Sequence, residues 1–367
     1  MPPAQPNPPL RARPLRLGFL PLTDAAPLIV AQSSGIFARH GLHVELRREI
    51  GWATLRDKIT YGELEAAQAP APMLWAMQLG LSTPLCDVLT ALVLNRNGNA
   101  ITLSRALWDA GVRDGASLKE HARSRQNRTP LTFGMVFTYS THHLMLARWL
   151  QSSGLEPGRD VRLVVVPPAQ MFRNLAAGTI DGFCAGEPWN THAVREGAGW
   201  CPAWSAALHP GHVEKVLLVK QSFAETRATE HAAIVRAIAE AAAWCDEPQN
   251  REPLADLLAQ PQYLDLPAAA IAPALLGRFD CGHGRIESVP DFHVFHRGEA
   301  SVPTVTAATA LQRALAEGGL LPGAAADPQL PRRLFREDLP REIFATPHDL
   351  HEITTPSDLR GVGSQSG

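Results

Sequence analysis

The chain contains 367 residues, of which 45% are hydrophobic and 19% are charged, and its formal net charge is -2. The length exceeds the usual size of one hydrophobic core and predicts two lobes, while the composition is typical of a soluble globular protein. The near-neutral charge argues against direct nucleic-acid binding, which normally requires a strongly basic surface.

The N-terminal region and the cysteines bear on the compartment of the protein. Residues 1–14 form a proline-rich polar arm that we expect to be disordered, and they lack the apolar run of a signal peptide. No apolar stretch reaches the roughly 20 residues that cross a bilayer. The five cysteines are widely spaced and no two have the spacing of a zinc site, so we expect reduced thiols, no metal and no cofactor. Together these features predict a cytoplasmic protein without membrane contact.

Strands and helices are predicted to alternate through the first hundred residues. Strands are predicted at 16–22, 42–49 and 64–69, and helices at 25–33, 53–61 and 70–79. Two further strand-like runs, at 87–94 and 100–103, flank Asn97-Gly98, which is a favourable pair for a tight turn.

The alternation restarts after a polar segment at 104–130. Strands are predicted at 131–137, 161–166, 181–185 and 215–220, and helices at 141–152, 170–177 and 230–246. We therefore predict an α/β fold with two lobes and mainly parallel sheets. In this division lobe 1 comprises residues 15–103 and 214–345, lobe 2 comprises residues 104–213, and residues 346–367 form a flexible tail.

Motifs of enzyme chemistry are absent from the sequence. It contains no G-x-x-x-x-G-K-[ST] phosphate-binding loop, no G-x-G-x-x-G after the first strand and no G-x-S-x-G nucleophile elbow. Close histidine pairs, among them His142 with His143 and His293 with His296, lack the i, i+4 spacing of a helical zinc site. We therefore expect a protein that is not an enzyme.

Four sequence segments together resemble one family. They are L-T-D-A-A-P-L at 22–28, G-W-A-T-L-R-D at 51–57, V-V-P-P-A-Q-M at 165–171 and D-G-F-C-A-G-E-P-W-N at 181–190. In this order they resemble the nitrate- and bicarbonate-binding proteins of ABC importers, and also the cytoplasmic nitrate/nitrite sensors of the NasS type. The resemblance implies a type II periplasmic-binding-protein fold, in which the ligand lies in a cleft between two hinged lobes.

The residues themselves favour an anion site in such a cleft. Thr23 and Asp24 follow the predicted strand at 16–22, and Thr141 follows the predicted strand at 131–137. In open α/β sheets ligands bind beyond the carboxyl ends of the strands, where helix N-termini attract negative charge. Nitrate accepts hydrogen bonds and has no proton to give, so its site requires donors and a nearby cation.

The resemblance implies roles for three residues. Trp52 would donate its indole N–H to the anion, His142 would donate from its ring, and Lys215 would supply the cation. The residues alone leave other roles open, namely core packing for Trp52, helix capping for His142 and a solvated strand end for Lys215. Neighbouring residues of a strand face opposite sides, so only one of Glu214 and Lys215 can face the cleft, and we predict Lys215.

Thr141, Gln68 and Asn99 complete the predicted ligand-binding set. Gln68 and Asn99 lie at strand ends that can face the cleft, and Asn99 stands where nitrate-binding relatives carry the longer glutamine. Glu187, in the segment E-P-W-N, is expected to fix its loop by hydrogen bonds, because a carboxylate repels an anion.

The resemblance leads to one expected function and several alternatives. We expect a cytoplasmic sensor that binds nitrate or nitrite and controls an RNA-binding antiterminator of the NasT type. The first alternative is the substrate-binding component of a nitrate importer or a bicarbonate importer of the ABC class. A further alternative from another class is a thiamine-pyrimidine biosynthetic enzyme, which shares the fold but requires a reactive histidine and cysteine in one pocket.

Overall fold

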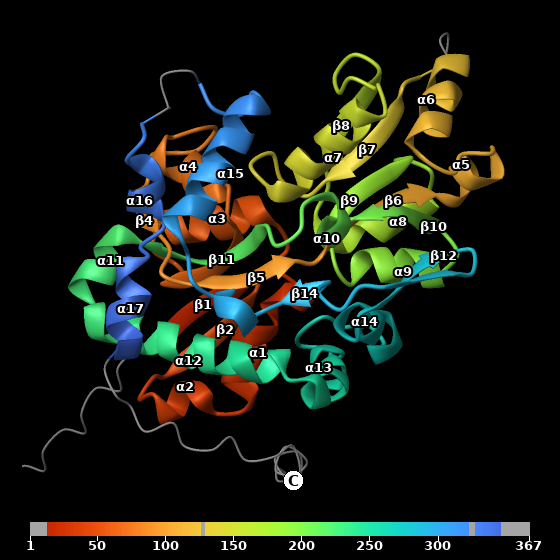
Figure 1. Ribbon diagram of the computed structural model, residues 1–367. Helices are drawn as coiled ribbons and strands as arrows, with labels where there is room; N and C mark the ends of the chain where they lie inside the picture. The colour runs from red at the N-terminus through yellow and green to blue at the C-terminus, as the bar shows by residue number, and fades with distance from the viewer. Residues whose placement is uncertain (1–12, 126–128, 323–326, 346–367) are drawn as a thin grey trace, which may run out of the picture.

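The computed structural model describes residues 13–125, 129–322 and 327–345, and Figure 1 shows two α/β lobes lying side by side. All but the last two residues of the arm predicted at 1–14, and the whole tail predicted at 346–367, lie outside the described residues. Within them, no helix has both the length and the apolar character that crossing a membrane requires.

The first lobe is built on a seven-stranded sheet with the order β14-β5-β11-β3-β1-β2, in which β4 also pairs with β11. Its strands are β1 (Leu15–Phe19), β2 (Val44–Arg48), β3 (Ala66–Pro70), β4 (Val88–Leu89), β5 (Val93–Asn97), β11 (Val213–Lys220) and β14 (His293–Val294). β1 pairs in parallel with β2 and β3, whereas β11 pairs antiparallel with β3, β4 and β5.

The helices of the first lobe come from both ends of the chain. They are α1 (Ala26–Ser33), α2 (Ile36–Arg39), α3 (Trp52–Thr60), α4 (Met73–Gln78), α11 (Gln221–Thr226), α12 (Ala228–Asp246), α13 (Arg251–Leu258), α15 (Val305–Glu317), α16 (Leu330–Leu334) and α17 (Asp338–Ala345). The alanine-rich α12 packs along α1 and α2, and its apolar face joins the core beneath β1. Short 3-10 turns lie at Thr23–Ala25, Pro168–Gln170, Pro248–Asn250 and Arg297–Glu299.

The second lobe is built on a five-stranded sheet with the order β10-β6-β9-β7-β8. Its strands are β6 (Asn99–Ser104), β7 (Leu131–Met135), β8 (Val161–Val165), β9 (Gly182–Gly186) and β10 (Gly199–Trp204). Its helices are α5 (Arg105–Asp109), α6 (Gly115–Ser124), α7 (Thr141–Ser152), α8 (Met171–Ala176), α9 (Trp189–Arg195) and α10 (Ser205–Leu208). β7 is parallel to β8 and β9, and β6 is antiparallel to β9 and β10.

The predicted fold class, an α/β protein with two lobes of the periplasmic-binding-protein type, is confirmed. The sheets are mixed rather than mainly parallel, because each lobe receives a strand that arrives from the other lobe and runs antiparallel to its neighbours. In the first sheet this strand is β11, beside β3, and in the second it is β6, beside β9.

The division between the lobes differs from the predicted one in two places. β5 pairs in the first sheet and β6 in the second, so Asn97-Gly98 is the crossing between the lobes, not a hairpin turn. Both residues have positive φ, 61° and 93°, which a turn pair can adopt, and the first crossing therefore lies before residue 103.

The second difference lies in the last third of the chain, which we assigned wholly to lobe 1. Helix α14 (Ala268–Leu275) packs on α9, and the hairpin of β12 (Arg278–Gly282) and β13 (Arg285–Ser288) reaches α9 and β10. The buried side chains of Phe279 and Cys281 join Ala100 and Cys201 of the second lobe. Apolar burial thus ties this segment to the second lobe.

Candidate functional site

The six predicted site residues are all buried, and they come from both lobes. Trp52 begins α3, Gln68 lies in β3 and Lys215 lies in β11, all in the first lobe. From the second lobe, Asn99 begins β6, and Thr141 and His142 occupy the first turn of α7. Lys215 forms a buried pair with Glu214, four of the other residues contact or approach this pair, and Gln68 reaches it through Asp24.

Lys215 is held between two carboxylates. Its Nζ lies 2.5 Å from Glu214 Oε1 and 3.0 Å from Asp24 Oδ2, and all three side chains are fully buried. The prediction that only one of Glu214 and Lys215 can face the site is wrong. The register of β11 against β5 shifts on both sides of Lys215, and this irregularity breaks the alternation on which the prediction depended.

The Glu214 carboxylate collects donors from several elements. Its Oε2 accepts hydrogen bonds from Asn99 Nδ2 at 2.6 Å and from the Thr141 hydroxyl, and lies 3.1 Å from His212 Nε2. The two predicted residues Asn99 and Thr141 are therefore bonded to a carboxylate. Neither Glu214 nor His212 is among the predicted site residues. The strand irregularity that turns Glu214 inward has no signature in V-E-K-V, and His212 reaches the site only through its contact with Glu214.

Gln68 is bonded at both ends within the first lobe. Its Oε1 accepts a hydrogen bond from the backbone N–H of Leu20 at 2.8 Å, and its Nε2 donates to Asp24 Oδ1. These bonds favour a role for Gln68 in orienting Asp24 toward Lys215.

Trp52 and His142 carry buried nitrogens that have no hydrogen-bond partner among the described residues. These are Trp52 Nε1 and both ring nitrogens of His142. His142 Nε2 lies 3.4 Å from Glu214 Oε1, and Lys215 Nζ lies 5.5 Å from the centre of the Trp52 ring. Leaving a buried polar group unpaired costs about 1–3 kcal/mol, so donors placed in this way suit a ligand that accepts hydrogen bonds.

Burial sets the charge of each ionisable group in this cluster. It lowers the pKa of His142 to about 3, so the ring is neutral and offers one N–H at pH 7. It raises the pKa of Asp24, against the pull of Lys215. Burial would also lower the pKa of Lys215, but Asp24 and Glu214 raise it instead. Lys215 therefore supplies the predicted positive charge, but its ammonium group is already paired with the carboxylates of Asp24 and Glu214.

Glu214 ionises more readily than its burial alone would allow. Burial would raise its pKa, but the neighbouring groups hold the pKa well below its usual range. Because His142 is itself uncharged near neutral pH, we assign this effect to Lys215 and to the donors around the carboxylate.

The segment Glu187-Pro188-Trp189 of the second lobe forms hydrogen bonds to the first lobe beside this cluster. The carbonyl oxygen of Glu187 accepts from the backbone N–H of Thr23 at 2.8 Å, and Trp189 Nε1 donates to the Pro21 carbonyl at 3.1 Å. Glu187 Oε2 accepts from the backbone N–H of Thr191 at 3.2 Å, and burial raises the pKa of this acid to about 7. As expected, Glu187 fixes its own loop.

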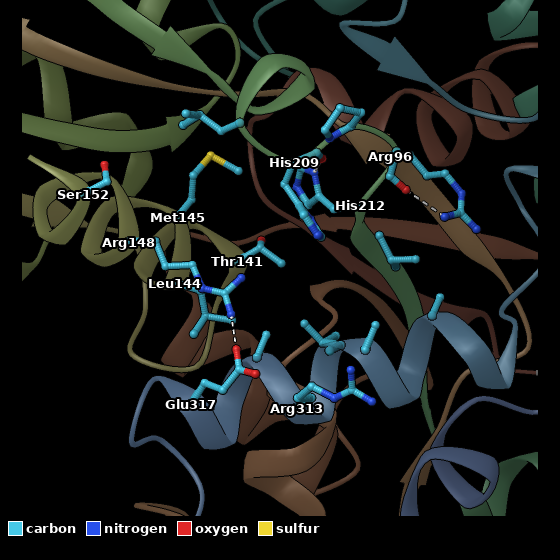
Figure 2. Close-up of a pocket in the computed structure, with 18 residues that line it drawn as sticks. Arg96, Thr141, Leu144, Met145, Arg148, Ser152, His209, His212, Arg313 and Glu317 are labelled. Carbon is cyan, nitrogen blue, oxygen red and sulfur yellow. Dashed lines mark hydrogen bonds and ion pairs between the residues drawn. The ribbon is translucent and has the colours of Figure 1, made fainter. Parts of the chain in front are cut away.

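A pocket of about 600 Å³ opens beside the cluster (Figure 2). It lies between α7, the chain at 208–213 and α15, and Arg148 on one wall pairs with Glu317 on another at 2.7 Å. Thr141 and His212 line this pocket and also contact Glu214, so they connect the buried cluster with the opening. In the part of the chain that the structure describes, no group of three or more His, Cys, Asp or Glu side chains could hold a metal ion.

Two lobes, each built on a mixed sheet, meet over a buried polar cluster, and this arrangement defines a solute-binding protein fold of the periplasmic type. The chain belongs to the NMT1-like family, whose profile matches residues 9–259.

Two named relatives are similar to most of this chain. The chain is 40% identical over 297 residues, or 79% of its length, to the nitrate import ATP-binding protein NrtC of Synechocystis sp.. It is 42% identical over 252 residues, or 68% of its length, to the bicarbonate transport ATP-binding protein CmpC of the same organism. It spans only 44% and 38% of these relatives, respectively.

A solved structure covers nearly the whole chain. The crystal structure of the periplasmic nitrate-binding protein NrtA from Synechocystis PCC 6803 superposes with a TM-score of 0.87 at 29% identity. The match covers 91% of this chain and 89% of NrtA.

Proposed function

We propose that this protein binds nitrate or nitrite between its lobes, as the substrate-binding unit of an ABC importer, and that it is not an enzyme. The observation that carries the proposal is the set of unpartnered donors on Trp52 and His142 beside Lys215. An anion with several acceptor oxygens could pair with these donors while lying near the ammonium group. The names of NrtC and NrtA support nitrate as the ligand.

Bicarbonate is the second candidate ligand, and Glu214 favours it. A carboxylate can accept a hydrogen bond from a ligand that carries a hydrogen, as bicarbonate does and nitrate does not. CmpC, a relative named for bicarbonate transport, supports the same candidate.

Ligand-dependent thermal unfolding tests the proposal. A ligand that binds only the folded state raises the melting temperature by mass action, so nitrate or nitrite should raise it at millimolar concentrations. Sulfate should have little effect, because one shared ammonium cannot offset the burial of a divalent anion. Stabilisation by bicarbonate alone would transfer the proposal to the second ligand, and equal stabilisation by sulfate would contradict a site for monovalent anions.

A second candidate function is a cytoplasmic sensor that controls an RNA-binding antiterminator of the NasT type. The hydrogen bonds between Thr23 and Glu187 and between Trp189 and Pro21 support it, because opening the lobes would break them and reshape the surface. Co-purification with an antiterminator, with and without nitrate, tests this candidate. A complex whose stability does not change with nitrate would contradict it.

A further inference from the structure

His212 presents both ring nitrogens to hydrogen-bond acceptors. Its Nδ1 lies 3.1 Å from the carbonyl oxygen of His209, and its Nε2 lies 3.1 Å from Glu214 Oε2. The His212 side chain is 5% exposed and that of Glu214 is fully buried, so water has little access to the contact between them.

A neutral imidazole cannot satisfy both contacts. It carries one N–H, whereas a carbonyl oxygen and an ionised carboxylate only accept hydrogen bonds. The geometry is satisfied when the His212 ring carries two N–H groups beside an ionised Glu214, whose pKa the neighbouring groups hold well below its usual range. One additional proton then lies in the His212–Glu214 pair.

This proton changes the charge of the site. Asp24 and Glu214 surround the single ammonium group of Lys215, which leaves one negative charge uncompensated when both acids are ionised. Such a cluster repels an anion, and repulsion between buried charges is poorly screened. A proton on the His212–Glu214 pair makes the cluster neutral and removes this repulsion.

We propose that the anion binds together with one proton, which the His212–Glu214 pair holds, so that anion affinity depends on pH. This inference rests on the proposed function, because it concerns the same site. His212 also lines the pocket, so the proton can exchange with solvent without passing through the buried cluster.

Other titratable or charged groups surround the pair. They are Asp24, Lys215, His142, Cys184, His209 and His293, and Glu187 lies in the neighbouring segment that bonds to Thr23. Burial keeps the His142 and His293 rings neutral and the Cys184 thiol protonated near pH 7. Asp24, whose pKa burial also raises, and Glu187, with a pKa of about 7, are therefore the alternative carriers of a proton, and the experiment must separate both from His212.

Calorimetric titration of the full chain with nitrate between pH 6 and pH 9 tests the proposal. If one proton enters with each anion, the affinity falls by about tenfold per pH unit wherever the free protein lacks that proton. Titrations in two buffers of different ionisation enthalpy should show uptake of about one proton per anion over the same range.

Three variants locate the proton. His212→Gln keeps a donor beside Glu214 but cannot hold the additional proton, so its affinity should be reduced at pH 6 and should not vary with pH. His209→Gln is the matched control, because the His209 side chain lines the same pocket and its ring centre lies 5.7 Å from that of His212, but the hydrogen bond to His212 comes from the His209 backbone carbonyl. It should retain the wild-type pH dependence, as should Glu187→Gln. Proton uptake that survives in His212→Gln, or is lost in Glu187→Gln, would overturn the assignment.

A measurement on the ligand-free protein keeps the inference testable even if a variant does not fold. Nitrogen NMR of the histidine rings at pH 6 should show two protonated nitrogens on His212, or a proton shared with Glu214. A singly protonated ring that donates only to His209 would overturn the inference. Absence of nitrate binding at every pH would instead contradict the proposed function, leaving the NMR result to decide the placement of the proton.

Discussion

At the scale of single residues, the site is a set of donors around a cation that is shared by two acids. Trp52 and Lys215 come from the first lobe, and His142 and Thr141 come from the second. Thr141 is bonded to Glu214, whereas the Trp52 and His142 nitrogens have no partner among the described residues. Anion recognition should therefore depend most on Trp52 and His142.

Trp52→Phe tests whether the unpartnered indole N–H of Trp52 is needed for anion binding. The change removes the indole N–H while keeping an aromatic ring in the core, so nitrate affinity should fall by roughly tenfold to a hundredfold, the value of one hydrogen bond to a charged group. The matched control is Trp75→Phe, because Trp75 is buried in the same lobe and its Nε1 is bonded to Gln312. Calorimetry that shows equal losses in both variants would contradict the role of Trp52.

Lys215 should matter for stability as well as binding. In Lys215→Met the Asp24 and Glu214 carboxylates lose the ammonium group that lies between them. Breaking a buried ion pair costs about 3–5 kcal/mol, so urea unfolding should show a loss of that size. The control is Lys58→Met, whose ion pair with Glu49 is partly exposed and should contribute less than about 1 kcal/mol. Equal stability losses in the two variants would contradict the buried pairing of Lys215.

Glu187 should make stability depend on pH. Its folded-state pKa of about 7 lies above its ordinary value of 4.5, so the folded protein binds this proton more tightly than the unfolded chain does. The stabilisation is complete below pH 4.5 and is lost as the pH rises toward 7, by on the order of 3 kcal/mol. Unfolding of Glu187→Gln at pH 5 and pH 8 should lack this difference, and a variant with the full wild-type difference would contradict it.

At the scale of elements, regular segments could be predicted from the sequence and strand irregularities could not. The helix predicted at 141–152 is α7 (Thr141–Ser152), because the Ser140 side chain caps its first turn by accepting from the N–H of His143. The irregularity of β11 depends on its pairing with β5, a contact between segments about 120 residues apart, and local patterns carry no trace of it. Glu214 was therefore assigned to the wrong face.

The sequence likewise predicts a turn at Asn97-Gly98, but it does not show that this turn joins the two sheets. Gly98 has a φ of 93°, and a Cβ there would lie 2.6 Å from His293 Cε1 and 2.8 Å from Asn95 Nδ2. Gly62 has a φ of 75° with nothing within 4 Å of such a Cβ. The two positions thus share the backbone preference and differ in the space around them.

Gly98→Ala should therefore destabilise the protein more than Gly62→Ala. Both changes place alanine at positive φ, which costs about 1 kcal/mol, and Gly98→Ala adds displacement of the buried His293 ring. The difference in unfolding free energy, measured in urea, reports the close packing at the crossing. Equal losses in both variants would contradict that packing.

At the scale of the whole molecule, the lobes are closed on each other over the polar cluster. Buried apolar residues form one continuous set across the boundary, with Leu22 and Trp52 from the first lobe and Phe137 and Trp189 from the second. The two-lobe arrangement could be predicted from the chain length and the two blocks of strands and helices. The docking of α14, β12 and β13 on the second lobe could not, because their apolar residues suit either lobe.

A crystal structure of the protein grown with nitrate tests the central claim most directly. We expect density for one planar anion within hydrogen-bond distance of Trp52 Nε1 and a ring nitrogen of His142, close to Lys215. Anion density that lies only in the open pocket beside α15, or a nitrate-saturated crystal with these donors still unpartnered, would contradict a nitrate site at Trp52 and His142.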